Sequence, residues 1–184
     1  MDVNSSYKLI YSKISKEWFN LSFTLNEPSF YRFFCLWNSF NALYILIGDL
    51  YTRDSERQKI LIGQLNKDDA NKIIESAKNL IRDPIRDLKG ELFKLNQPPD
   101  VENFDYTKLT YERDYTNLEK LEHIVTILYR IRNNLTHGSK KITGMNIEIV
   151  NKANLVLKII VEKCIEEKLP KLDNENSNNY NGDK

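Results

Sequence analysis

The sequence predicts an all-α protein, a single-domain helical bundle of about five to seven helices. Two observations support this class. Apolar residues recur every three or four positions over most of the chain, which is the period of one face of an α-helix. The chain also lacks convincing hairpins and internal repeats. Its 184 residues favour one domain with short extensions.

The N-terminal part predicts a first helix and then a central one. One apolar face of the first helix is marked by Ile10, Tyr11, Ile14 and Trp18. A break follows near residues 26–28, where Pro28 stands. Residues 29–47 (SFYRFFCLWNSFNALYILI) are apolar on nearly every side, which predicts a central buried helix. Their aromatic content also suits a strand, but the length favours a helix.

The middle of the chain predicts amphipathic helices. Residues 55–80 indicate one or two of them, with Asn66 or Asp68 available to begin the second. Asp83 and Pro84 match an N-cap followed by proline at the first helical position, so a further helix is predicted to begin there.

A long acidic loop at about 96–115 precedes the next predicted helix, because this segment has two adjacent prolines, many acids and no helical period. Thr116 and Glu119 then form a capping box. The helix that they open has a common apolar face of Leu118, Leu121, Ile124, Val125, Leu128, Ile131 and Leu135. Gly138 is a natural C-terminal stop for this helix.

A last helix is predicted over about 146–169, with Pro170 beyond its end. Its apolar face contains Val150, Ala153, Leu157, Ile160, Val161 and Cys164. The predicted organisation is an N-terminal helix and linker (1–28), a helical domain (29–170) and a disordered polar tail (171–184).

Composition excludes several classes of protein. The net charge of +1 excludes a strong overall field for polyanions, so nucleic-acid binding must depend on a local patch. We find no signal-peptide pattern and no run of ~18 apolar residues, so we expect a cytoplasmic protein with no membrane segment. Cys35 and Cys164 lack paired spacing, which predicts buried thiols in a reducing compartment. His123 is interpreted as a surface or packing residue.

No Gly-rich phosphate loop, His-x-x-x-His pair or Cys-x-x-Cys pair is present, and we expect neither a cofactor nor a metal. The remaining candidate is residues 129–141, YRIRNNLTHGSKK. No acidic residue lies between Glu122 and Glu148, and this interval contains four basic residues: Arg130, Arg132, Lys140 and Lys141. The segment is therefore locally positive.

Arg132 and His137 are the two groups in this segment that can carry chemistry. An imidazole with a pKa near ~6.5 suits proton transfer, and a guanidinium can hold phosphate oxygens through two parallel hydrogen bonds. An ideal helix would place the two about 140° apart. Either the chain unwinds near Gly138, or the groups converge with those of a second subunit.

The position of Arg132 on the apolar stripe favours the second subunit, because a lone buried arginine is costly. On spacing alone, an ordinary helix end is the commoner explanation, since basic residues suit the negative end of the helix dipole.

Two segments resemble the HEPN superfamily (higher eukaryotes and prokaryotes nucleotide-binding). RNNLTH (132–137) is similar to its Arg–four-to-six-residues–His signature, in which a polar residue often follows the arginine, as Asn133 does here. FYRFFCLWNSFNALY (30–44) resembles the early helix of ApeA-like and related HEPN proteins. The order of the predicted helices is similar to that of HEPN proteins over about residues 29–169, but only these two segments match motifs of the family.

The resemblance implies a helical bundle that forms a homodimer with the two motifs facing each other across a cleft. It implies a metal-independent endoribonuclease acting on tRNA or single-stranded RNA. The RNA 2′-hydroxyl attacks the adjacent phosphate, and the products carry a 2′,3′-cyclic phosphate and a 5′-hydroxyl. His137 would be the general base or acid, and Arg132 would hold the scissile phosphate. Asn133 would position the phosphate or the histidine by hydrogen bonding. Backbone phosphates would be contacted by Arg130, Lys140 and Lys141.

A toxin or antiviral defence effector, or an RNA-processing enzyme, would fit this activity, with an antitoxin or inhibitor protein as a further partner. HEPN toxins controlled by a nucleotidyltransferase typically have tyrosine where this chain has Ser139, which argues against control by that route. Two other interpretations stay open. One is a non-catalytic HEPN module that binds RNA, nucleotide or a partner protein; the other is a scaffold in which Arg132 completes a dimer seam.

Overall fold

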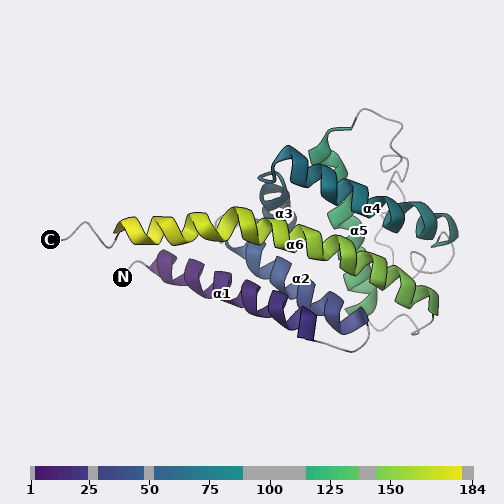
Figure 1. Ribbon diagram of the computed structural model, residues 1–184, viewed down its shortest axis with the longest axis horizontal. Coiled ribbons are helices and arrows are strands. Elements are labelled where there is room, and N and C mark those ends of the chain that lie inside the picture. The colour runs from purple at the N-terminus through teal and green to yellow at the C-terminus, as the bar shows by residue number, and fades with distance from the viewer. Residues whose placement is uncertain (1–2, 25–28, 48–51, 89–114, 137–143, 180–184) are drawn as a thin grey trace.

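The computed structural model describes residues 3–24, 29–47, 52–88, 115–136 and 144–179. Within these residues the chain forms six α-helices and no strand (Figure 1). The helices are α1 (Val3–Thr24), α2 (Ser29–Ile45), α3 (Asp54–Ile62), α4 (Lys67–Leu88), α5 (Asn117–Thr136) and α6 (Gly144–Asn179). The predicted all-α bundle is confirmed.

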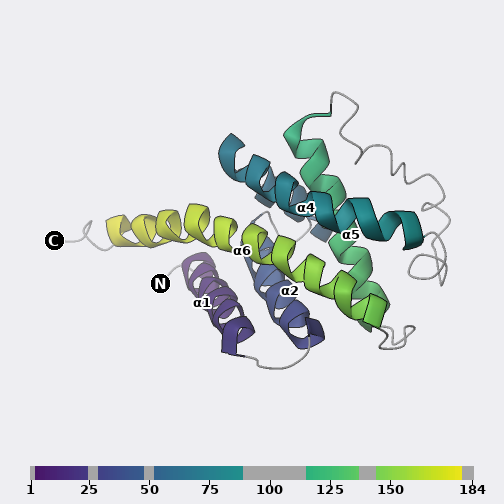
Figure 2. The ribbon, with the colours of Figure 1, turned by 45° about the vertical axis from the view of Figure 1, so that its right-hand side comes forward.

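Helix α2 is the centre of the bundle, as its sequence predicted. It contacts α1, α3, α5 and α6, and in Figures 1 and 2 it lies between α1 and α6. Its large side chains fill the core: Phe33, Leu36, Trp37, Phe40, Leu43 and Tyr44 are buried. Cys35 on α2 and Cys164 on α6 are also buried and are free thiols, as the sequence predicted.

Small polar residues join α1 to α2. The Ser15 hydroxyl donates to the Ser39 carbonyl oxygen at 3.1 Å, and the Ser39 hydroxyl donates to the Ser15 carbonyl oxygen at 2.8 Å. Both serines are fully buried. Each buried hydroxyl therefore has a partner, and the small side chains allow the two helix backbones to come close.

The start of α4 is held by Asn66, one of the two predicted caps. The Asp69 amide donates to Asn66 Oδ1 at 2.9 Å, so the asparagine fills the N-cap role. Asn66 Nδ2 donates to Asp69 Oδ2 and to Glu167 Oε1, each at 2.9 Å. The cap is thereby connected to α6, where Lys163 Nζ also lies 3.7 Å from Asp69 Oδ1.

The start of α5 is the predicted capping box. The Glu119 amide donates to Thr116 Oγ1 at 3.3 Å, and the Thr116 amide donates to Glu119 Oε2 at 2.8 Å. This reciprocal pair satisfies two amides at the helix start. One turn later, Glu122 is paired with Lys59 of α3 at 3.0 Å, which fixes α5 against α3.

Two predicted helix boundaries are wrong. Asp83 and Pro84 were expected to start a helix, but they lie inside α4. The apolar period that begins with Ile73 and Ala77 continues in register across them, and this continuous face outweighs the local start signal and the missing proline amide.

The last helix was predicted to end before Pro170 and to be followed by a disordered tail from 171. Instead α6 continues through Pro170 to Asn179, and its end extends past the start of α1 in both views (Figures 1 and 2). Lysine, leucine and glutamate predominate just before and after the proline, and these are good helix formers. Gly138 and residues 96–114 of the predicted loop lie outside the described residues. Among the described helices, none combines the length and apolar character needed to cross a membrane.

The serine contact predicts a strict size limit at the α1–α2 crossing. We expect Ser15→Leu to lower the free energy of unfolding by about 1–3 kcal/mol, because the added atoms overpack a closed contact. Lys16→Leu adds the same side chain on an exposed position and should cost far less. Urea denaturation of both variants measures this, and equal losses would contradict the close packing.

Candidate functional site

Helix α5 carries the predicted site at its C-terminal end. Its apolar side is buried in the core through Leu121, Ile124, Leu128 and Ile131. Arg132 follows Ile131 directly and is half-buried, whereas Ile131 is buried in the core. This confirms that the arginine lies beside the apolar face of the helix.

Arg132 and Asn133 are joined by a hydrogen bond. Arg132 Nη1 donates to Asn133 Oδ1 at 2.9 Å, and Asn133 is also half-buried. In the last turn, the Thr136 hydroxyl donates to the Arg132 carbonyl oxygen at 2.8 Å. The side-chain amide therefore holds one nitrogen of the guanidinium, and a guanidinium has further N–H groups that can donate to another acceptor.

A buried tyrosine from α2 lies near this arginine. Tyr44 is 4% exposed. Burial of its phenol, followed by the negative charge of Asp54, raises the pKa of Tyr44 to about 12. A hydrogen bond with Gln58 and the positive charge of Arg132 act in the opposite direction, while Tyr129 raises the pKa further. Tyr44 is therefore a neutral hydroxyl group throughout the physiological pH range.

The helices that carry the two HEPN-like segments pack against each other. Arg132 and Asn133 of the second segment lie near the end of α5, and the segment 30–44 lies in α2. In the same segment, the Trp37 ring lies 6.0 Å from the Tyr129 ring, at an interplanar angle of 52°. The structure thus packs the aromatic helix α2 against the C-terminal half of α5.

Sequence reasoning missed Tyr44, whose phenol lies near Arg132, and Gln58, which is hydrogen-bonded to Tyr44. For Tyr44 a weak signal existed, because a tyrosine near the end of a largely buried helix usually needs a hydrogen-bond partner for its hydroxyl group. Gln58 gave no such signal. It is buried in α3, a short helix in which nothing in the spacing distinguishes it from exposed polar residues.

The other predicted site residues are placed as follows. Arg130 is half-buried, and the two-residue step from Arg132 puts it about 200° away around the helix, so the two arginines cannot grip one phosphate together. His137, Lys140 and Lys141 lie outside the described residues. His123 is half-buried and its ring lies 6.5 Å from that of Tyr115, in keeping with a packing role.

Comparison with known proteins gives no relative. The chain matches no protein-family model, no curated protein and no solved structure.

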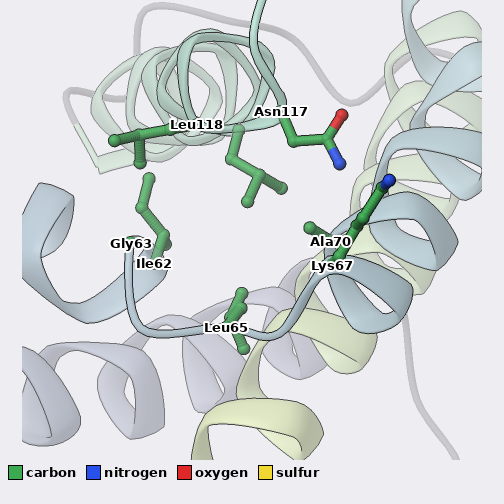
Figure 3. A pocket seen from close by; sticks show the side chains of 8 residues that line it. Ile62, Gly63, Leu65, Lys67, Ala70, Asn117 and Leu118 are labelled. Atoms are coloured by element: carbon green, nitrogen blue, oxygen red, sulfur yellow. The ribbon is translucent and has the colours of Figure 1, made fainter.

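A small pocket of about 230 Å³ lies elsewhere on the bundle, between the α3–α4 turn and the start of α5. Figure 3 shows Ile62, Leu65 and Leu118 around its hollow, with Lys67 and Asn117 at one side. The pocket explains why Leu118, predicted to be in the core, is 42% exposed. Leu118 is 14 residues from Arg132, or about 20 Å along the helix. The pocket is therefore separate from the arginine site.

The buried phenol predicts a specific loss of stability at alkaline pH. The pKa of Tyr44 is raised from 10.0 to about 12 on folding, so the stability that the neutral phenol contributes is present below pH 10 and is lost as the pH rises through about 12. We expect Tyr44→Phe to lose less stability than the wild type between pH 8 and pH 11. At pH 8 the variant should be slightly less stable, because it lacks the Gln58 hydrogen bond.

Urea denaturation at the two pH values measures this difference. Tyr31→Phe is the control, because Tyr31 is 62% exposed and should follow the wild type. A Tyr44→Phe variant that also follows the wild type at both pH values would contradict the assignment.

Proposed function

We propose that this chain is an endoribonuclease of the HEPN type, which cleaves RNA without a metal ion at a site containing Arg132, Asn133 and His137. The observation that supports it most directly is the meeting of the two HEPN-like segments. They lie on different helices, α2 and α5, yet these helices pack together, and the Trp37 ring lies 6.0 Å from that of Tyr129, three positions before Arg132.

The proposed role of Arg132 is to bind the phosphate that is cut. Within the described part of the chain, no carboxylate lies within 4.0 Å of its guanidinium, and its recorded partner is the neutral amide of Asn133. Among the described residues, the positive charge is therefore not cancelled by an ion pair. Phosphate oxygens can accept the remaining N–H groups, and the negative charge that develops in the transition state strengthens these bonds.

The proposed role of His137 is proton transfer. The 2′-oxygen of the RNA forms a bond to the adjacent phosphorus and loses its proton to a base, while the bond from phosphorus to the 5′-oxygen breaks and that oxygen gains a proton from an acid. The products are a 2′,3′-cyclic phosphate and a 5′-hydroxyl. One imidazole supplies one of these transfers, and the same motif of a second copy, facing it across a homodimer cleft, would supply the other.

The remaining basic residues would raise the affinity for RNA but contribute little to the recognition of its base sequence. Arg130, on the other side of α5, together with Lys140 and Lys141, would contact backbone phosphates of tRNA or single-stranded RNA. The overall charge of only +1 limits attraction at long range, so binding depends on this local segment and weakens as salt is added. A toxin or antiviral defence effector in the cytoplasm, restrained by an antitoxin or inhibitor protein, is the cellular role that fits such an activity.

The first test is RNA cleavage by the purified protein in the presence of EDTA. We expect wild-type protein to cut tRNA or single-stranded RNA and His137→Ala to be inactive, because the proton-transfer group is gone. Gel analysis of end-labelled RNA measures both. Equal activity of the two proteins would contradict the catalytic role, and binding of RNA without cleavage by the wild type would favour the non-catalytic module.

The second test distinguishes bidentate binding of the phosphate by Arg132 from a general effect of its positive charge. Arg132→Lys keeps the charge but loses the two-pronged geometry, and we expect its cleavage rate to fall about 100-fold or more. Arg130→Lys is the matched control two positions away on the other side of the helix, and its rate should change only a few-fold. Rates that fall equally in the two variants would count against a specific role of Arg132.

A further inference from the structure

Helix α1 turns its less apolar side toward the bundle. The residues that it buries most completely are Ser12, Ser15 and Ser22. Its apolar stripe, by contrast, stays partly exposed. The stripe consists of Tyr7, Ile10, Ile14, Trp18 and Leu21, which a helical projection places within an arc of about 80°.

The exposure of this stripe is substantial. Tyr7 is 50%, Ile10 53% and Leu21 42% exposed, while Ile14 and Trp18 are half-buried. Figures 1 and 2 show α1 at the outer edge of the bundle, with α2 and α6 on one side of it. The described helices therefore leave Tyr7, Ile10 and Leu21 largely uncovered and cover Ile14 and Trp18 only in part. All the charged residues of α1, which are Lys8, Lys13, Lys16 and Glu17, project outside the arc.

The exposed area fits one side of a protein–protein interface. The exposed parts of the five side chains amount to about 250–450 Å² of mainly apolar surface, taking 150–250 Å² for each aromatic residue and somewhat less for each aliphatic one. A standard interface buries about 800 Å² on each partner, of which a little over half is apolar. The stripe thus supplies much of the apolar share that one partner needs, and the nearest charged residue, Glu17, lies at its border and not within it.

The spacing within the stripe identifies the partner. Successive residues are three, four, four and three positions apart, so the pattern is the same in both directions from Ile14. Two such helices in antiparallel orientation match residue for residue, with Tyr7 opposite Leu21 and Ile10 opposite Trp18. A twofold axis requires a self-complementary surface, because both subunits contribute the same patch to the interface.

We propose that the stripe on α1 is a docking surface for a second copy of this chain, with the two α1 helices antiparallel and a twofold axis passing near Ile14. This contact is separate from the cleft required by the proposed function, because that cleft is at the end of α5 and α1 has no extensive contact with α5. Two different twofold contacts can coexist in a tetramer made of two dimers.

Cysteine crosslinking tests the axis directly. In the proposed pair, two Ile14→Cys side chains face each other and should form an intermolecular disulfide under mild oxidation with copper phenanthroline. The native Cys35 and Cys164 are 5% and 1% exposed, so their background reaction should be small. Lys16→Cys is the matched control, because it is exposed on the same helix but about 200° away around the axis.

The orientation is tested with two further variants. Tyr7→Cys and Leu21→Cys should crosslink when mixed, and each alone should give little product, because the antiparallel pairing places unlike positions together. Non-reducing gels with differently tagged chains distinguish the products, and circular dichroism confirms that each variant is folded.

Three results would overturn the proposal: Ile14→Cys crosslinking no better than Lys16→Cys, Tyr7→Cys crosslinking mainly with itself, or the stripe being covered by a different protein. RNA cleavage is measured separately, so loss of the crosslink and loss of the nuclease activity are distinguishable.

Discussion

Burial of the aromatic helix α2 is the constraint on which the rest of the structure depends. Its large side chains can be removed from water only if other helices pack on several of its sides, because they surround much of its circumference. Helices α1, α3, α5 and α6 provide this cover. The arrangement around Arg132 follows from the same constraint, because packing Trp37 beside Tyr129 sets the position of the end of α5.

The arginine is tolerable at this place because several weak effects act together. It is only half-buried, so much of its hydration is retained. It donates to Asn133, it has the neutral phenol of Tyr44 nearby, and it lies close to the negative end of the α5 dipole. None of these removes its charge. A cation that is positioned by neutral groups is better suited to receive an anionic ligand than one already paired with a carboxylate.

Much of this fold could be predicted from the sequence because its signals are local. The capping box at Thr116 and the cap at Asn66 depend on residues three positions apart, and the burial of α2 depends on composition alone. The boundaries predicted at Asp83 and Pro170 were wrong because a local signal was given too much weight. A local start or stop signal decides a boundary only when the surrounding apolar period and helix propensity do not outweigh it.

The candidate site was only partly predictable. Arg132 and Asn133 could be found because they are consecutive on one helix. Tyr44 and Gln58 come from other helices, and spacing along the chain does not say which helices meet. The partly exposed stripe on α1 has a similar origin. The sequence shows that Ile10, Ile14 and Trp18 share a face, but only the packing of the serines on α2 shows that this face does not point into the core.

The central claim is that this chain cuts RNA through attack by the 2′-hydroxyl at a phosphate held by Arg132. The most direct measurement is to compare one oligonucleotide that the protein cleaves with the same oligonucleotide carrying a single 2′-deoxy nucleotide at the cleaved position. The account predicts that the all-RNA strand is cut to a 2′,3′-cyclic phosphate and that the substituted strand binds equally well and stays intact at that position. Cleavage of the substituted strand at the same phosphate, or failure to cut any RNA, would contradict it.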